Sequence, residues 1–202
     1  MRSNAVKVLI LAEDFVKDEF LLQPIIQAMM KAVGKPKAKV KVCKDPRFHG
    51  TGEALKWDYI EQALSRHRGM VDLYLLCVDR DGNANRQVVL GNLENQAAAV
   101  IGKGRAFLAE NAWQEVEVWV LMGHELLPKW DWKKIRKETH PKETYYQPFA
   151  KSRGALDLPG EGRDKLAREA ALYYDQIRGR CKEDIQRLEG RILEWIGDRS
   201  NR

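Results

Sequence analysis

Residues 75–82 read Leu-Leu-Cys-Val-Asp-Arg-Asp-Gly, and the rest of the chain can be organised around this stretch. Its apolar part is typical of a strand buried on both faces of a sheet. The run ends at two carboxylates, Asp79 and Asp81, and because residues two apart in a strand point to the same side, both are expected to face one point. Ligands of open α/β sheets bind at this end of the strands, and Mg²⁺ and Mn²⁺ prefer carboxylate ligands. An acidic turn that closes a strand is the alternative, since Asp-Gly is a common turn pair.

The chain before this stretch alternates predicted strands and helices. Residues 6–12, Val-Lys-Val-Leu-Ile-Leu-Ala, form another apolar run, which ends at Glu13. Residues 39–43 alternate polar and apolar side chains, as in a strand exposed on one side. Helical spacing of apolar residues predicts helices within residues 18–34, 53–67 and 93–101. This order predicts an α/β fold with a layered, Rossmann-like, mostly parallel sheet flanked by helices.

The composition is that of an ordinary globular protein, with 44% hydrophobic and 32% charged residues in a chain of 202. No apolar run approaches the roughly 20 residues that cross a bilayer, and the first strand begins too early to leave room for a signal peptide. Three well-separated cysteines, Cys43, Cys77 and Cys181, have apolar neighbours, so we expect reduced, buried thiols. These features predict a cytoplasmic protein, and the net charge of +6 favours a polyanionic partner.

Residues 105–121 admit two interpretations. Residues 105–108 predict a further strand, whereas residues 113–121, Trp-Gln-Glu-Val-Glu-Val-Trp-Val-Leu, alternate as in a strand but could equally open a helix. In a strand, Glu115 and Glu117 would share a face. A buried face with two carboxylates requires a cation or a basic group, and an exposed edge strand is the alternative.

Residues 128–153 contain eight Lys or Arg against three Asp or Glu, interleaved with aromatic side chains. Basic groups for phosphates and rings for stacking are what a nucleic-acid groove uses. A solvated basic segment whose aromatic side chains pack on the core is the alternative. Arg47 and His49 of a predicted loop could also approach a phosphate, although a plain connecting loop accounts for them. The candidate nucleic-acid contacts are Lys133, Lys134, Arg136, Lys137, Lys151 and Arg153.

The last part of the chain is predicted to be helical. Apolar residues recur at spacings of three and four over residues 166–195, as in one long helix or two, with Gly179 and Gly190 as weak points. This stripe carries no chemistry, and we expect it to pack on the sheet or on another subunit. We therefore divide the chain into an α/β domain, residues 1–153, and a helical C-terminal extension, residues 154–202.

Acidic groups thus lie at or near the ends of three predicted strands. In a parallel sheet these ends share one edge, so the carboxylates can converge although they are far apart in sequence. Converging carboxylates repel one another, and a divalent cation removes that repulsion while it polarises a phosphoryl oxygen or activates water. With a basic strip nearby, the arrangement predicts metal-assisted cleavage or transfer of a phosphodiester.

Two motifs resemble the pair found in TOPRIM domains: residues 9–13, Leu-Ile-Leu-Ala-Glu, and residues 78–82, Val-Asp-Arg-Asp-Gly. TOPRIM domains occur in topoisomerases, primases and the OLD (overcoming lysogenization defect) nucleases, with a glutamate after the first strand and Asp-x-Asp after a later one. Residues 115–121, followed by His-Pro-Lys at 140–142, resemble the small stand-alone TOPRIM-like relatives of OLD nucleases. The resemblance covers residues 6–150.

The resemblance implies a nuclease that uses Mg²⁺ or Mn²⁺ and acts on nucleic acid, DNA in the first place. The implied metal ligands are Glu13, Asp79, Asp81 and Glu117. Together with the first three of these carboxylates, Lys142 would act in catalysis near the scissile phosphate, with Lys151 as the second choice. In the relatives, such domains are fused to or encoded beside ABC-type ATPases and often act in defence against phage. This sequence has no ATPase motif, so the implied ATPase would be a separate partner.

The sequence also departs from the family's pattern. Glycine usually follows the first glutamate, where this chain has Asp14. Relatives often have a second acid four residues after that glutamate, where this chain has Lys17, with Asp18 and Glu19 only near that position. These departures admit a one-metal site, a slower enzyme or a domain without catalysis. The alternatives are therefore a non-catalytic module that binds nucleic acid or protein, and an enzyme acting on nucleotides or small phosphoesters.

Overall fold

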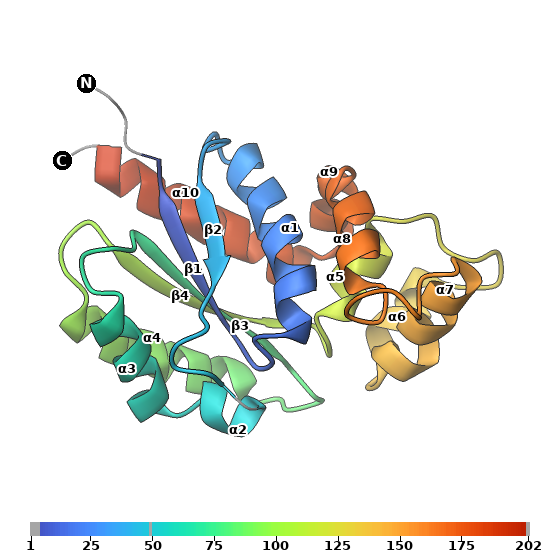
Figure 1. The fold of residues 1–202 in the computed structure, drawn as a ribbon, viewed down its shortest axis with the longest axis horizontal. Helices are drawn as coiled ribbons and strands as arrows, with labels where there is room; N and C mark the ends of the chain where they lie inside the picture. The colour runs from blue at the N-terminus through green and yellow to red at the C-terminus, as the bar shows by residue number, and fades with distance from the viewer. Residues whose placement is uncertain (1–4, 49, 201–202) are drawn as a thin grey trace.

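The computed structural model describes residues 5–48 and 50–200, which form a four-stranded sheet flanked by helices (Figure 1). All pairings are parallel, and the strands lie in the order β2-β1-β3-β4. Their bounds are Lys7–Ala12 for β1, Lys39–Val42 for β2, Leu73–Asp79 for β3 and Ala106–Ala112 for β4. The predicted α/β fold with a parallel sheet is confirmed.

Side chains of β1 and β3 alternate between two cores, one on each face of the sheet, whereas β2 contributes Val40 and Val42 to one core and exposes Lys39 and Lys41. Ile10 of β1 and Leu75 of β3 belong to the first core, which α1 (Lys17–Ala32) covers. Leu11 and Leu76 belong to the second core, on the opposite face. The helices of this second face are α2 (Thr51–Ala54), α3 (Trp57–Arg66) and α4 (Arg86–Val100). Because each of these side chains is worth about 1.5–3 kcal/mol when buried, the two apolar runs fix which way the strands face.

The strand order creates a switch point between β1 and β3. The chain leaves β1 through α1, on the first face, and continues to β2 on one side of β1. It leaves β3 through α4, on the second face, and continues to β4 on the other side. Because the two connections diverge, a crevice opens at the carboxyl ends of β1 and β3, where ligands bind in folds of this kind.

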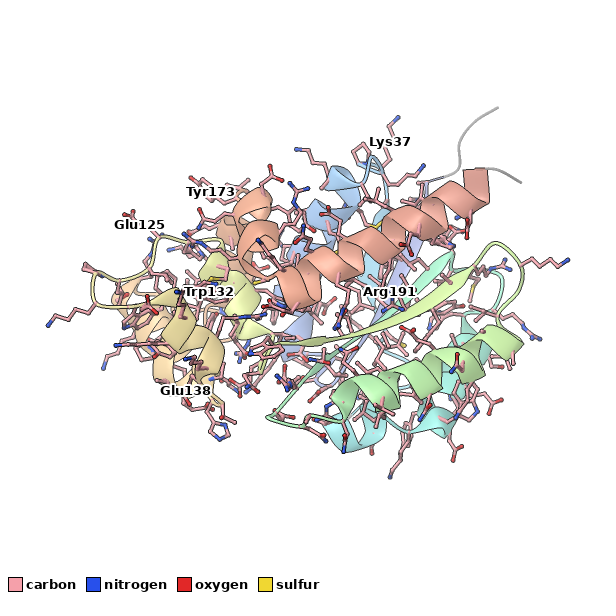
Figure 2. All side chains as sticks on the ribbon, turned by 180° about the vertical axis from the view of Figure 1, so that it is seen from behind. Lys37, Glu125, Trp132, Glu138, Tyr173 and Arg191 are labelled. Atoms are coloured by element: carbon pink, nitrogen blue, oxygen red, sulfur yellow. The ribbon has the colours of Figure 1, made fainter. Side chains whose placement is uncertain are left out.

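Short helices follow the sheet and return to cover its first face. They are α5 (Glu117–Met122), α6 (Trp132–Lys137), the π-helical segment η1 (Lys142–Tyr146), α7 (Gln147–Ser152), α8 (Arg163–Ala171), α9 (Tyr174–Arg180), the π-helical segment η2 (Lys182–Gln186) and α10 (Arg187–Ser200). α10 runs beside β4, and Arg191, labelled in Figure 2, donates a hydrogen bond to the carbonyl of Ala109 at 3.0 Å. The C-terminal helices therefore pack on the sheet and share its first core.

Two sequence interpretations are resolved by this architecture. The stretch at 113–121 does not continue the sheet, because β4 ends at Ala112 and α5 begins at Glu117. The predicted apolar stripe is buried except for Tyr173, which is exposed, and it is divided at Tyr173 and Cys181 rather than at the two glycines. These breaks let α8 and α9 cover α1 and α5 while α10 covers β4, which one straight helix could not do.

The cysteines and helices of the described residues also bear on the environment of the chain. All three cysteines are buried free thiols, as predicted. Burial raises the pKa of the Cys43 thiol to about 11, so this group stays neutral. Among residues 5–48 and 50–200, no helix has both the length and the apolar character that crossing a bilayer requires.

Candidate functional site

Glu13 and Asp79 lie at the switch point, at the carboxyl ends of two neighbouring strands. Glu13 follows β1 directly, and Asp79 is the last residue of β3. The Asp79 N–H donates to Oε1 of Glu13 at 2.8 Å, and the Thr51 hydroxyl donates to Oε2. The Glu13 carbonyl accepts from the N–H of Gly50 at 2.9 Å. Glu13 is therefore held between the end of β3 and the start of α2.

Asp79 is held in turn by the segment that leads from β4 into α5. Its Oδ1 accepts from the Val116 N–H at 2.9 Å, while the described residues provide no hydrogen-bond donor to its other oxygen. The residue that follows Val116 is Glu117, the first residue of α5, which is buried. The ends of β1, β3 and β4 are thus tied together, and each brings a carboxylate.

A third acidic group, Asp18, comes from the first turn of α1. Its Oδ2 accepts from the Asp14 N–H at 3.0 Å, which anchors the side chain at the start of the helix. Lys17, which stands where relatives have an acid, instead forms an ion pair with Glu161 at 3.1 Å. The start of α1 therefore contributes an acidic side chain to the surroundings of Glu13 through Asp18 and not through Lys17.

A cavity of about 550 Å³ brings these groups together. Five carboxylates line it, those of Glu13, Asp14, Asp18, Asp79 and Glu117, and three basic residues, Lys17, Lys142 and Arg163, line it as well. Arg163 begins α8, and its Nη2 is 2.5 Å from Oε1 of Glu117 in an ion pair buried on both sides. The complete charged lining is Glu13, Asp14, Lys17, Asp18, Asp79, Glu117, Lys142 and Arg163.

The carboxylates of this cavity are hard to ionise together. Burial raises the pKa of Asp79 well above its usual range, and the charges of Glu117, Glu13 and Asp18 add to the effect. Burial, with Glu117, Asp14 and Glu13, raises the pKa of Asp18 to about 7. The pKa of Glu13 is also raised by burial, although hydrogen bonds from Thr51 and Asp79 oppose the shift. Such a set needs protons or a cation, and its all-oxygen donors suit a divalent cation such as Mg²⁺ or Mn²⁺.

Asp81 lies outside the cavity lining. β3 ends at Asp79, and Asp81 has a left-handed backbone conformation with φ of 51°. The alternation of a strand therefore does not reach Asp81, and the expectation that both aspartates face one point is wrong. Its exposed carboxylate instead pairs with Arg86 at 3.3 Å, although its charge still contributes to the raised pKa of Glu13.

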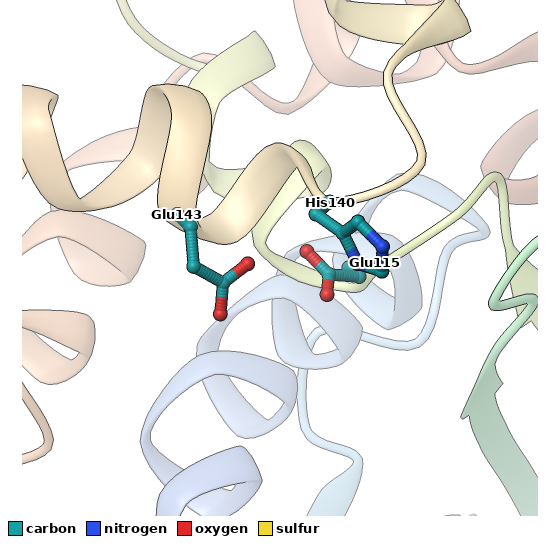
Figure 3. Close-up of side chains that lie close together, drawn as sticks. All are labelled: Glu115, His140 and Glu143. Atoms are coloured by element: carbon teal, nitrogen blue, oxygen red, sulfur yellow. The ribbon is translucent and has the colours of Figure 1, made fainter.

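A second group that could hold a metal consists of Glu115, His140 and Glu143 (Figure 3). One ligand atom from each lies within 4.8 Å of the others. Glu115 comes from the segment before α5 and is buried, whereas the other two lie at the start of η1 and are exposed. Oε2 of Glu115 accepts from the Lys142 N–H at 2.7 Å, and burial is the main cause that raises its pKa to about 7. The group suits a divalent cation without specifying which one.

The predicted basic strip is only partly available to a ligand. Lys133, Lys134 and Lys137 are exposed on α6, and Lys151 and Arg153 are exposed near the end of α7. Arg136 is buried and pairs with Glu183 at 2.6 Å and Asp184 at 3.2 Å, so its guanidinium serves the interior.

The aromatic side chains of the same segment pack inward. Tyr146 and Phe149 are buried in the first core, and the ring of Trp130 stands edge-on to Tyr145 at 5.1 Å between centroids. Tyr146 and Phe149 therefore pack in the core, whereas Trp130, Trp132 and Tyr145 are only partly buried, so the use of these three rings as stacking platforms for bases stays a prediction. Arg47 lies over the ring of Phe15, 5.3 Å from its centroid, while His49 lies outside the described residues.

Two members of the cavity were not predicted from the sequence. Asp18 was visible only as an acid one residue from an expected position, and a helix that starts at Lys17 turns it toward Glu13. Arg163 gave no local signal, because its partner Glu117 is 46 residues away along the chain. Of the predicted catalytic and metal-binding residues, Glu13, Asp79, Glu117 and Lys142 line one cavity and Asp81 does not. Comparisons of the chain with protein-family models, curated proteins and solved structures found no match.

Proposed function

We propose that this protein is a metal-dependent nuclease of the TOPRIM type, which cleaves the phosphodiester backbone of nucleic acid, DNA in the first place. The observation that carries the proposal is the convergence of Glu13, Asp18 and Asp79 on one cavity at the switch point of the sheet. Carboxylates that are buried with raised pKa and without a cationic partner are typical of functional sites. A purely structural role would leave their mutual repulsion uncompensated.

The residues of the cavity divide into two chemical roles. Glu13, Asp18 and Asp79 would hold Mg²⁺ or Mn²⁺, which supplies Lewis-acid polarisation of a phosphoryl oxygen and a more acidic bound water. Lys142 lines the same cavity and would place its ammonium group against a phosphate oxygen. The hydrogen bonds from Thr51, Asp79 and Val116 keep the carboxylates of Glu13 and Asp79 oriented, as the surroundings of metal ligands generally do.

The resemblance to TOPRIM domains supports this assignment at the positions that the cavity unites. The glutamate after the first strand is Glu13, and the first aspartate of Asp-x-Asp is Asp79. The acid missing at Lys17 has a substitute in Asp18, so the departure there does not argue against catalysis. The same resemblance suggests a separate ABC-type ATPase as a partner and a role in defence against phage.

The test is cleavage of supercoiled plasmid and of single-stranded DNA with Mn²⁺ or Mg²⁺. Asp79→Asn removes one ligand charge with almost no change in shape, and we expect it to abolish cleavage, as should a chelator. Asp175→Asn is the matched control, because the Asp175 side chain is 85% exposed on α9, away from the cavity, and cleavage should be unchanged. Equal cleavage by the wild type and Asp79→Asn would overturn the proposal. Binding of DNA without cleavage under either metal would favour the non-catalytic module instead.

A further inference from the structure

We infer that Arg163 serves as a built-in second cation of this site: it neutralises Glu117, so that the cavity binds one divalent cation, on Glu13, Asp18 and Asp79. This inference rests on the proposed function and specifies how its site is charged. It also changes the role of Glu117, which the resemblance alone would make a metal ligand.

The first support is the burial of the ion pair. The side chains of Arg163 and Glu117 are 1% and 5% exposed, and Nη2 lies 2.5 Å from Oε1. Ionised groups are removed from water to this extent only when they are paired and hydrogen-bonded. Because an arginine stays protonated at every accessible pH, Glu117 has a permanent positive partner inside the cavity.

The second support is that Arg163 is fixed from behind. Its Nη1 donates to the Gly160 carbonyl at 2.9 Å and pairs with Glu161 at 3.0 Å. Glu161 in turn pairs with Lys17 at 3.1 Å, at the start of α1. The guanidinium also lies over the ring of Tyr146, 5.5 Å from its centroid. A side chain restrained in this way keeps its charge beside Glu117 when the cavity fills.

The backbone before Arg163 contributes to the same restraint. Gly162 has φ of +80°, and a Cβ there would lie 2.7 Å from the Ala155 carbonyl oxygen. Only glycine adopts this conformation without strain in so little space. The turn at Gly162 therefore delivers Arg163 to the cavity as the first residue of α8, from a part of the chain outside the predicted α/β domain.

The third support is the balance of charge. Glu13, Asp18, Asp79 and Glu117 are four of the five carboxylates that line the cavity, and Lys17 and Lys142 line it with Arg163. The fifth carboxylate, Asp14, accepts from the N–H groups of Val16 and Lys17 at 2.9 and 3.0 Å. Arg163 compensates Glu117, and no described residue forms an ion pair with Glu13, Asp18 or Asp79. A second divalent cation at Glu117 would have to displace the guanidinium or be repelled by it. One divalent cation bound by Glu13, Asp18 and Asp79 would offset the charge of these three unpaired carboxylates.

The experiment is a calorimetric titration of the full chain with Mn²⁺, with electron paramagnetic resonance to count bound ions. All chains carry His140→Ala and Glu143→Gln, which remove the second group that could hold a metal, and the wild type below is the chain with these two changes alone. We expect one ion per wild-type chain and loss of binding in Asp79→Asn. Glu117→Gln should keep one ion with an affinity within about threefold, because Glu117 is not a ligand. Arg163→Met frees Glu117 and should raise the number of bound ions to two. The double variant Glu117→Gln/Arg163→Met should bind one ion again. If Arg163→Met alone does not fold, the double variant still tests the inference.

A matched control is Glu169→Gln, which removes a glutamate paired to an arginine, Arg153, outside the cavity and should bind Mn²⁺ as the wild type does. Two ions per wild-type chain would overturn the inference and leave the nuclease proposal standing. Equal weakening by Glu117→Gln and Asp79→Asn would do the same, because Glu117 would then be a ligand. A wild-type chain that binds no Mn²⁺ or Mg²⁺ would overturn both.

Discussion

The carboxylates of Glu110 and Asp184 are buried and those at the carboxyl ends of β1 and β3 are half-buried, but only the first set is paired with cations. Glu110 is fully buried and accepts from Arg187 Nε at 2.8 Å and from Gln87 at 2.9 Å. Asp184 is 1% exposed and accepts from the Trp113 N–H at 2.8 Å, from the Trp119 indole at 3.0 Å and from Arg136. These partners come from different elements, so the paired carboxylates join β4, α6 and the C-terminal helices into one body.

The carboxylates of the switch point have hydrogen-bond donors but no cation of their own. Glu13, Asp18 and Asp79 accept from backbone N–H groups and from Thr51, and none of them takes part in a salt bridge of the described residues. Their pKa values are raised because burial and their mutual charges disfavour ionisation. Under the proposed function, the contrast separates carboxylates that stabilise the fold from carboxylates that would bind a cation.

The largest expected effect distinguishes the two sets of carboxylates: one member of each set is replaced, and the free energies of unfolding are compared. Asp184→Ala leaves Arg136 buried without its closest internal partner and strips an acceptor from two tryptophans, so we expect a loss of about 3–5 kcal/mol in the free energy of unfolding. Asp79→Asn removes a repelled charge, so without metal it should not lower that free energy. Urea denaturation in the presence of a chelator measures both. Equal destabilisation by the two changes would contradict the division.

The second prediction concerns pH. The pKa of Asp18 rises from an ordinary value of 3.8 to about 7 in the folded protein, so between these values the folded state holds a proton that the unfolded state has lost. The metal-free protein should therefore lose stability as pH rises from about 4 to 7, and the raised pKa of Asp79 acts in the same direction.

Denaturation midpoints measured from pH 5 to pH 8 with a chelator present test this sign. Asp18→Asn cannot ionise, so its midpoint should depend less on pH and should match or exceed that of the wild type at pH 8. Mn²⁺ at pH 8 should restore the stability of the wild type and do less for Asp18→Asn, because a ligand that binds only the folded state stabilises it. A midpoint of the metal-free wild type that rises over this range would show that the carboxylates are not repelling one another.

The sequence predicted those residues of the site that stand directly at the end of a strand. The apolar run before Asp79 and the one before Glu13 predicted two buried strands, and parallel pairing then places both carboxylates at one edge. The prediction that Asp81 faces the same point as Asp79 extended the strand by two residues, whereas the chain turns after Asp79 and Asp81 has a left-handed backbone conformation. Local patterns thus determine which residues end a strand but not the conformation of the turn that follows.

The missed residues have partners that are distant in sequence. Arg163 meets Glu117 only after the chain has passed through α6 and α7, and Arg136 meets Asp184 across the interface with η2. A sequence pattern over the length of one helix or strand cannot indicate pairs of residues so far apart in sequence. The sequence therefore places Arg136 with its exposed lysine neighbours. Which basic residues of this segment are exposed and which pair inside the protein depends on the packing of the C-terminal helices.

The smallest expected effect concerns the basic residues of α6, which are of two kinds, exposed and unpaired or buried and paired. Lys133, Lys134 and Lys137 are exposed, and among the described residues none of them forms a salt bridge, whereas Arg136 is buried and paired. Changing the three lysines to glutamine should weaken duplex DNA binding by up to about tenfold at low salt, leave the free energy of unfolding nearly unchanged, and reduce the slope of log K against log salt by up to about 0.9 per lost contact. Fluorescence anisotropy at several salt concentrations measures the slope.

The matched control for the α6 lysines changes three exposed lysines near the amino end of β2 to glutamine: Lys31, Lys37 and Lys39. It alters net charge by the same amount, so any difference between the two triple variants reports location rather than overall charge. Equal losses would mean that DNA responds only to the net charge of the chain and that α6 is no contact surface. A larger loss of DNA affinity from the α6 variant, with the free energy of unfolding unchanged, would mean that unpaired lysines contact the DNA. The distinction between paired and unpaired charges inside the protein would then hold at its surface as well.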